Sequence, residues 1–252
     1  MTELKACNSC ALNNSAQLLK LGINVDQADL VIALAGNPNT GKSTIFNALT
    51  GLKQHTGNWP GKTVTRAEGG YRYRDHKIKL IDLPGTYSLL STSQDEEIAR
   101  NFILFGKPDV TVIVVDSARI ERNLNLVLQI LEITDRAVLC LNLIDEALRH
   151  HIYIDERILS KELGIPVVKC SAIKKQGIPE LISTIHQVAK RQTICKPHRI
   201  KGLSRPAQKI VEKLDKKIRK NYPGIPNSRW IAMRLLDADA DIIKALKNGY
   251  FK

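Results

Sequence analysis

The stretch DLVIALAGNPNTGKSTIFNALTG, residues 29–51, decides the fold. Its first part, residues 29–36, is a β-branched and apolar run that ends in glycine and predicts a buried strand. Its last part, residues 42–51, has apolar side chains at helical spacing and closes with glycine, which predicts a helix. Between them lies GNPNTGKS, residues 36–43, with the spacing G-x-x-x-x-G-K-[ST]. Strand, loop and helix together predict a loop that binds phosphate groups.

The predicted phosphate loop has the chemistry to hold a nucleoside triphosphate. Its glycines let backbone N–H groups surround a β-phosphate, and the helix N-terminus adds positive charge. Lys42 would bridge the β- and γ-phosphates, and the Ser43 hydroxyl would take one magnesium coordination site. The alternative is a glycine-rich turn with a chance lysine, which the flanking strand and helix disfavour. The residues expected to contact the nucleotide here are Gly36, Asn37, Pro38, Asn39, Thr40, Gly41, Lys42, Ser43 and Thr44.

A second motif, DLPG at residues 82–85, stands at the end of another predicted strand. Asp82 is placed to hold magnesium through water, and the Gly85 N–H can meet a γ-phosphate. Alone, such a motif would be an ordinary turn. Its place downstream of a phosphate loop favours the functional interpretation.

Two further motifs predict a preference for guanine. NLID, residues 142–145, follows a predicted strand and matches N-K-x-D except that Leu143 replaces the lysine. The Asp145 carboxylate would accept hydrogen bonds from the N1–H and the N2 amino group of guanine, a pair that adenine cannot supply. A helix-capping aspartate is the alternative. Asn142 opens this motif and is also expected to contact the nucleotide. We expect guanine preference to persist because Asp145 carries the donor match, with modest affinity because Leu143 replaces the lysine that normally packs along the base. In CSA, residues 170–172, a backbone N–H of Ser171 or Ala172 would contact the guanine oxygen.

The order of these elements predicts the fold class. Strand and helix signals alternate over residues 28–191, which predicts an α/β GTP-binding domain of the Ras-like P-loop NTPase class, with a mainly parallel sheet flanked by helices. Residues 52–66 lack periodicity and predict a long loop, whereas YRYRDHKIKLIDLPG, residues 71–85, predicts an antiparallel pair. Residues 192–252 give only helical signals and predict a small all-helical subdomain. Residues 1–27 predict a polar extension with some helical content and no core of its own.

Composition bounds the remaining possibilities. The chain has 252 residues, and its share of 43% hydrophobic and 25% charged residues is that of a globular protein. No apolar run approaches the ~20 residues that cross a bilayer, and no signal peptide is recognised, so we expect a soluble, intracellular chain, either complete or part of a larger protein. Five cysteines without framework spacing argue against a disulfide scaffold. Much of the net charge of +13 comes from basic residues after position 190. Such a basic surface would attract nucleic acid or an anionic membrane leaflet. Alternatively, these residues form the solvent-exposed surface of helices and bind no partner.

The segments GNPNTGKSTIFNALTG, TGNWPGKTV, DLPGTYSL, IERNLNLVLQ and NLIDEA closely resemble the cytoplasmic head of the bacterial ferrous iron transport protein B family. The resemblance is strong over residues 28–190 and looser over the helical tail. It implies that Thr63 is the switch I threonine that reaches magnesium, with switch I at residues 52–66 and switch II at residues 83–95. It also implies that Asn39 helps to hold a K⁺ ion beside the phosphates. Hydrolysis of GTP to GDP would then depend on Lys42, Thr63, Gly85 and Asn39.

The resemblance carries implications for rate and context. Thr86 stands where Ras-like enzymes place the glutamine that orients the attacking water, so intrinsic hydrolysis should be slow, on the order of 10⁻³ s⁻¹ or below. The helical tail resembles the family's module that couples the GTPase to a membrane permease and slows GDP release. The permease would belong to the same polypeptide, which places this chain at the cytoplasmic face of the cell membrane, with its basic tail toward anionic lipid.

Competing functions remain open at the level of sequence. The leading one is a regulatory GTPase for ferrous iron uptake, in which iron itself does not bind the GTPase domain. The alternative is a free-standing, ribosome- or RNA-associated Era-like GTPase, although the tail lacks an RNA-binding signature and RNA is not the expected partner. An ATPase is a third possibility, because the base-reading motif lacks its lysine. Cys7 and Cys10 form either half of a metal site or a pair in a disordered tail.

Overall fold

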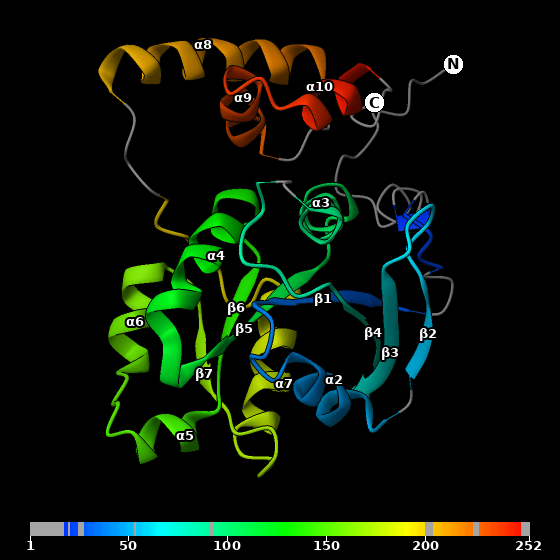
Figure 1. The fold of residues 1–252 in the computed structure, drawn as a ribbon, viewed down its shortest axis with the longest axis vertical. Helices are drawn as coiled ribbons and strands as arrows, with labels where there is room; N and C mark the ends of the chain where they lie inside the picture. The colour runs from blue at the N-terminus through cyan, green and yellow to red at the C-terminus, as the bar shows by residue number, and fades with distance from the viewer. Residues whose placement is uncertain are drawn as a thin grey trace.

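The computed structural model describes residues 18–19, 21–24, 28–52, 54–90, 93–199, 204–223 and 227–247. A seven-stranded sheet lies at the centre of this part of the chain, in the order β2-β3-β4-β1-β5-β6-β7 (Figure 1). Neighbouring strands from β4 to β7 run parallel, and the hairpin β2–β3 joins β4 in antiparallel fashion. The strands are β1 (Leu30–Gly36), β2 (Gln54–Asn58), β3 (Thr65–Tyr73), β4 (His76–Asp82), β5 (Val110–Asp116), β6 (Ala137–Asn142) and β7 (Val167–Lys169).

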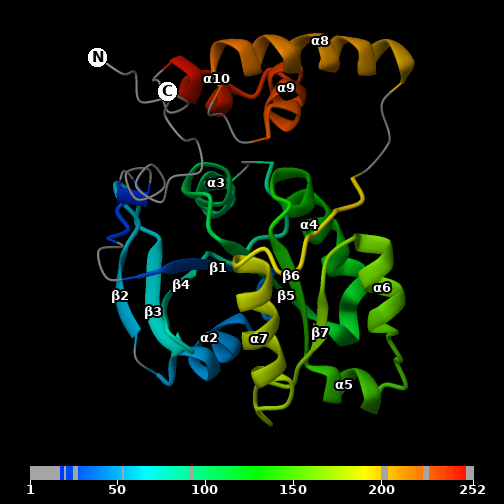
Figure 2. The same cartoon turned by 180° about the vertical axis from the view of Figure 1, so that it is seen from behind.

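Helices cover both faces of the sheet, because the central strands are apolar on both sides. All residues of β1, β5 and β6 are buried, as continuous β-branched and apolar runs require in a parallel sheet. One face packs against α2 (Lys42–Thr50) and α7 (Ile178–Ala189), and Figure 2 shows α7 in front of the sheet. The other face packs against α3 (Gln94–Asn101), the π-helix η1 (Phe102–Gly106), α4 (Ile120–Ile133) and α6 (Glu156–Leu163). Two short helices, η2 (Ser117–Arg119) and α5 (Ile144–Arg149), follow β5 and β6.

A helical region follows the sheet, as the sequence predicts. It consists of α8 (Arg205–Asn221), α9 (Ser228–Leu236) and α10 (Ala240–Lys247), which lie together over α3 and α4 (Figure 1). Trp230, Ile231 and Ile242 are buried and belong to the same apolar cluster as the adjacent face of the sheet. Within the described ranges, no helix combines the length and apolar character that crossing a membrane requires.

The alternation of strands and helices is confirmed, and so is the antiparallel pair, in which Tyr73 faces His76. The expectation that residues 52–66 form a loop is wrong for residues 54–58, which are β2, and for residues 65–66, which begin β3. Strand β2 adds to the edge of the sheet with Asn58 opposite Thr65. An edge strand needs backbone partners on one side only, so the polar sequence QHTGN forms a strand without apolar alternation.

Candidate nucleotide-binding site

The predicted phosphate loop leaves the carboxyl end of β1 and enters α2 at Lys42. Two of its glycines are required by close approach. A Cβ at Gly36 would collide with the carbonyl oxygen of Val114 on β5, and a Cβ at Gly41 would collide with the side-chain amide of Asn142. Gly41 also has φ +75, a left-handed conformation that favours glycine. The phosphate loop therefore packs closely against β5 at Gly36 and against Asn142 at Gly41.

The structure brings together Lys42 and Asp82, from the first and second motifs. The Lys42 Nζ lies 2.5 Å from Asp82 Oδ1 and donates a second hydrogen bond, of 2.6 Å, to the Leu83 carbonyl. Both side chains are largely buried, at 11% and 14% exposure. Burial raises the pKa of the Asp82 carboxyl above its ordinary value, and the Lys42 ammonium partly opposes that shift. Ser43, the next residue on α2, is exposed.

The DLPG motif rests directly on the phosphate loop. A Cβ at Gly85 would lie 3.2 Å from the Cα of Pro38, so a larger residue would push the two loops apart. The Thr86 N–H donates to the Gly36 carbonyl at 3.2 Å. Thr86 itself is buried, at 4% exposure, so its side chain faces the protein interior. The position that lacks the glutamine of Ras-like enzymes thus presents no side chain to solvent.

Asn142 joins three loops into one frame. Its Nδ2 donates to the Thr40 carbonyl in the phosphate loop at 2.9 Å, and its Oδ1 accepts from the Ala172 N–H at 3.2 Å. Its own carbonyl accepts from the Ser117 hydroxyl at 2.6 Å. Asn142 is 1% exposed, so all three bonds are shielded from water. The sequence predicts contact of Asn142 with a nucleotide but not this bracing role, nor the part of Ser117, which lies in no motif.

Asp145 lies in the first turn of α5, facing the loop that begins at Ser171. Its Oδ2 is 3.2 Å from the Lys174 Nζ. Desolvation opposes ionisation, but hydrogen bonds from Ser171 and Lys174 outweigh it and hold the pKa of Asp145 below its ordinary value. The carboxylate is therefore charged and oriented at neutral pH, as a guanine reader must be. No motif singled out Lys174, and its only signal in the sequence is its place three residues after Ser171.

Three predicted residues have fewer contacts. Leu143 adopts φ +58 at the start of α5, and Asn39 adopts φ +64 in an exposed part of the phosphate loop. Thr63 is exposed in the turn that joins β2 to β3, and within the described ranges no hydrogen bond links it to Ser43 or Asp82. Its predicted contact with magnesium stays a prediction. Residues 53, 91 and 92, within the predicted switches, and the pair Cys7 and Cys10 lie outside the described residues.

The sheet order, the loops at its carboxyl edge and the braced Asn142 define a class, the Ras-like P-loop nucleotide-binding domain with a helical region attached. Comparison with known proteins identifies the family. The sequence model of the protein family described as ferrous iron transport protein B matches residues 30–185 of this chain. The chain belongs to the ferrous iron transport protein B family.

Individual relatives show the same resemblance. The Fe(2+) transporter FeoB of Salmonella typhimurium is 39% identical over 214 residues, which are 83% of this chain and 27% of that protein. This chain therefore spans about a quarter of the length of the curated relatives it matches. The cytosolic domain of T. maritima FeoB in a GMPPNP form is similar with a TM-score of 0.79 and 40% identity, covering 87% of this chain and 86% of that one. The cytosolic domain of L. pneumophila FeoB has a TM-score of 0.77 and 36% identity, covering 86% and 84%.

Proposed function

We propose that this chain is the GTP-binding and GTP-hydrolysing regulatory domain of a ferrous iron transporter. The observation that carries the proposal is the frame around Asn142, which fixes the phosphate loop and the loop at residues 171–172 relative to each other. A charged Asp145, paired with Lys174 beside that frame, supports the proposed contact with guanine. The related cytosolic domain of T. maritima FeoB is known in GDP and GMPPNP forms, which supports the same ligand class here.

The nucleotide would lie along the carboxyl edge of the sheet. The phosphate loop from Gly36 to Thr44 would surround the phosphates with backbone N–H groups, and Lys42 would leave Asp82 for the β- and γ-phosphates. Asn142, Leu143 and Asp145 would meet the base, together with a backbone N–H of Ser171 or Ala172. Asn37 is buried at the start of the loop, where its carbonyl accepts from the Thr40 hydroxyl at 2.9 Å. Neither polar atom of its side-chain amide has a hydrogen-bond partner among the described residues.

Magnesium fits the side chains at this site. Ser43 would supply a hydroxyl oxygen to the ion, and Asp82 would hold it through water. The buried Asp82 carboxyl would gain from a second cation, because burial disfavours its charge. Thr63 would complete this set when switch I is ordered. The ion supplies charge neutralisation for the β- and γ-oxygens of the nucleotide. The protein side chains hold and orient it.

Hydrolysis would be slow, because the side chain of Thr86 is buried and carries no amide. Asn39, exposed in the phosphate loop, would help a K⁺ ion to supply positive charge beside the phosphates. We expect GTP hydrolysis at least ~10-fold faster in KCl than in NaCl, with Asn39→Ala removing the difference. The measurement is phosphate release at matched ionic strength, and equal rates in both salts would exclude the K⁺ role.

The transporter context rests on the relatives, which are Fe(2+) transporters and of which this chain covers 27%. A membrane permease would follow in the same polypeptide, with this chain at the cytoplasmic face. No observation on the described residues favours the RNA-associated alternative.

Competition against bound fluorescent GDP tests the proposed ligand. We expect GTP to compete at least ~100-fold better than ATP, because adenine leaves the Asp145 carboxylate unpaired. Asp145→Asn should lose this preference and accept xanthosine nucleotides. Asp155→Asn, at the exposed N-cap of α6, is the matched control and should behave like the unchanged chain. Equal competition by ATP and GTP would overturn the guanine assignment.

A further inference from the structure

A segment ahead of the sheet, which we term the N-terminal strap (residues 18–19 and 21–24), packs against the predicted switch I. The strap contains the end of a helical turn. There the Ile23 N–H donates to the Leu18 carbonyl, and the Gly22 N–H donates to the Leu19 carbonyl. Gly22 has φ +77, so this is a glycine-capped turn of the Schellman type. The cap gives the strap a fixed shape, which the sequence predicts only as some helical content.

Polar and close contacts attach the strap to the β2–β3 hairpin and to β4. A Cβ at Gly22 would lie 2.5 Å from Pro60 and 3.0 Å from the guanidinium of Arg66. The Arg66 Nη1 donates to the Leu21 carbonyl at 3.5 Å, and the Lys79 Nζ donates to the Asn24 carbonyl at 2.5 Å. In both views the strap, drawn in blue, lies beside the end of this hairpin that is close to α3 (Figures 1 and 2).

Apolar contacts fix the strap and the hairpin in one core. Leu18 and Ile23 are at most 1% exposed and share an apolar cluster with Trp59, the first residue of the β2–β3 turn. The Trp59 ring packs edge-on against Phe102 of η1, with centroids 5.6 Å apart. A Cβ at Gly106, the last residue of η1, would be 3.3 Å from Leu18. The strap therefore lies between the switch I hairpin and the segment that follows switch II.

The turn at residues 59–64 is closed by its own hydrogen bonds. The Trp59 N–H donates to the Val64 carbonyl, and the Lys62 N–H donates to the Trp59 carbonyl. Lys62 also pairs with Glu97 on α3 at 2.8 Å. Thr63 lies exposed within this turn. The buried Nε1–H of Trp59 has no acceptor among the described residues.

We infer that the N-terminal strap is an intramolecular regulator of switch I, docked on the surface formed by Trp59, Pro60 and Arg66. The docked strap holds the turn that carries Thr63 beside α3, where Lys62 pairs with Glu97. A movement of this turn to bring Thr63 to a magnesium ion beside a γ-phosphate would therefore compete with strap docking. GDP has no γ-phosphate and does not need Thr63. The strap therefore lowers the affinity for GTP relative to GDP, because only the fraction of molecules with an undocked strap can bind GTP with switch I ordered. This inference rests on the proposed function, and specifically on Thr63 as the switch I threonine.

The test is the ratio of the dissociation constants for GDP and GMPPNP, measured with magnesium on the whole chain. Gly22→Ala introduces strain and a clash with Pro60, which loosens the strap. We expect GMPPNP to bind at least ~5-fold tighter, with GDP affinity changed less than twofold. Gly51→Ala is the matched control, because Gly51 has φ +63 but nothing within 4 Å of the added Cβ. It should leave the ratio unchanged.

A second pair of variants keeps the test decisive if Gly22→Ala does not fold by circular dichroism. Leu18→Ala removes a side chain that is 1% exposed, and Leu19→Ala removes its neighbour, which is 53% exposed. Only the first should raise the relative affinity for GMPPNP. An unchanged ratio of the GDP and GMPPNP dissociation constants in Gly22→Ala and in Leu18→Ala overturns the inference. Equal weakening of GDP and GMPPNP binding in these variants also overturns it. If the unchanged chain binds neither nucleotide, the proposed function fails instead.

Discussion

Asn142 is the residue that the candidate site depends on most for its shape, because both ends of its amide are engaged with different loops. Asn142→Ala would leave the Thr40 carbonyl and the Ala172 N–H buried without partners. Each such group costs about 1–3 kcal/mol, so we expect the free energy of unfolding to fall by about 2–4 kcal/mol. Urea denaturation of the nucleotide-free protein measures this change.

The matched control for this prediction is Asn125→Ala, since Asn125 is exposed on α4. Its effect on the free energy of unfolding should stay within about 0.5 kcal/mol. Equal effects from the two substitutions would show that Asn142 does not brace the loops.

At the residue scale, sequence motifs identified the groups that chemistry constrains. They singled out Lys42, Asp82 and Asp145, because phosphate, magnesium and guanine each require fixed residue types at fixed spacing. The ion pair of Lys42 with Asp82 and the contact of Asp145 with the loop at residue 171 come from the structure. Ser117 and Lys174 were not predicted. Each contributes one contact from a loop whose position depends on the whole sheet, and no local pattern encodes that contact.

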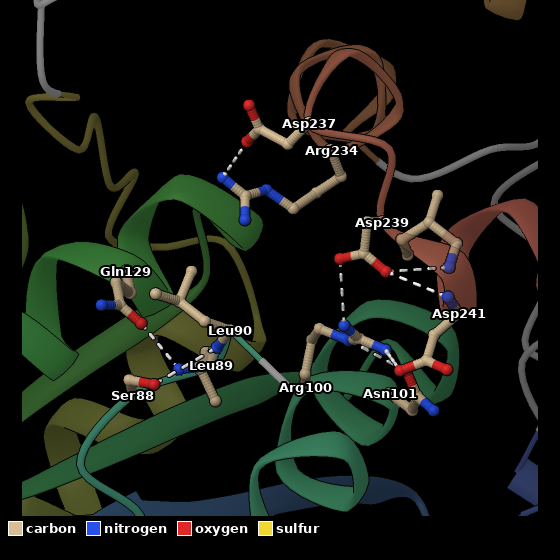
Figure 3. A network of polar contacts seen from close by, with 11 residues as sticks. Ser88, Leu89, Leu90, Arg100, Asn101, Gln129, Arg234, Asp237, Asp239 and Asp241 are labelled. Atoms are coloured by element: carbon tan, nitrogen blue, oxygen red, sulfur yellow. Dashed lines mark hydrogen bonds and ion pairs between the residues drawn. The ribbon is translucent and has the colours of Figure 1, made fainter. Parts of the chain in front are cut away.

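Helix α3 is one element that links the switches to the helical region, through Arg100. This side chain is fully buried, and its two Nη atoms lie 3.3 Å from the carboxylates of Asp239 and Asp241 at the start of α10 (Figure 3). The same figure shows the Gln129 side chain of α4 accepting from the Leu89 N–H within switch II. Helix α3 begins inside predicted switch II, so movement of that switch would pull on α10 through one guanidinium.

Arg100→Ala tests this link between elements. Removing one partner of a buried ion pair leaves Asp239, whose side chain is 10% exposed, without its charge partner. We expect a loss of about 3 kcal/mol in the free energy of unfolding, together with faster amide exchange in α10 and faster GDP release. Hydrogen exchange and stopped-flow GDP dissociation measure the two effects.

Arg157→Ala, on the exposed surface of α6, is the control for Arg100→Ala. It should change neither amide exchange nor GDP release. Unchanged protection of α10 in Arg100→Ala would show that apolar packing alone holds the helical region in place.

At the element scale, the sequence predicted elements with strong internal patterns and missed those made by tertiary pairing. β1, β5 and β6 were predicted because their apolar runs are continuous. β2 was missed because QHTGN has no apolar pattern and becomes a strand only by pairing with β3. The docking of Leu18 and Ile23 was also missed, since a short helical signal does not show which surface its apolar side chains pack against.

For the molecule as a whole, the distribution of charge predicts association with anionic lipid. On α8, Val211 and Ile218 face the protein, while most basic side chains are exposed. We expect the nucleotide-free chain to sediment with vesicles containing phosphatidylserine, more weakly at high salt, and not with neutral vesicles. Reversing three lysines of α8 to glutamate should weaken binding at least ~10-fold, at about 1 kcal/mol for each lysine. The lysines are Lys209, Lys213 and Lys216.

A matched triple reversal at exposed lysines outside α8, namely Lys161, Lys190 and Lys196, separates a specific face from total charge. If both triple variants lose binding equally, α8 has no special role, and the net charge of +13 alone explains the attraction.

The chain has two tryptophans, and they lie in the two parts that regulation would move. Trp59 begins the turn of switch I, and Trp230 is buried in α9 of the helical region. Emission from a buried indole shifts to longer wavelength when water reaches it. A Trp230→Phe chain would therefore report optically on the switch alone, and a Trp59→Phe chain on the helical region alone. The order in which the two regions respond to a nucleotide can thus be timed in real time without an attached dye.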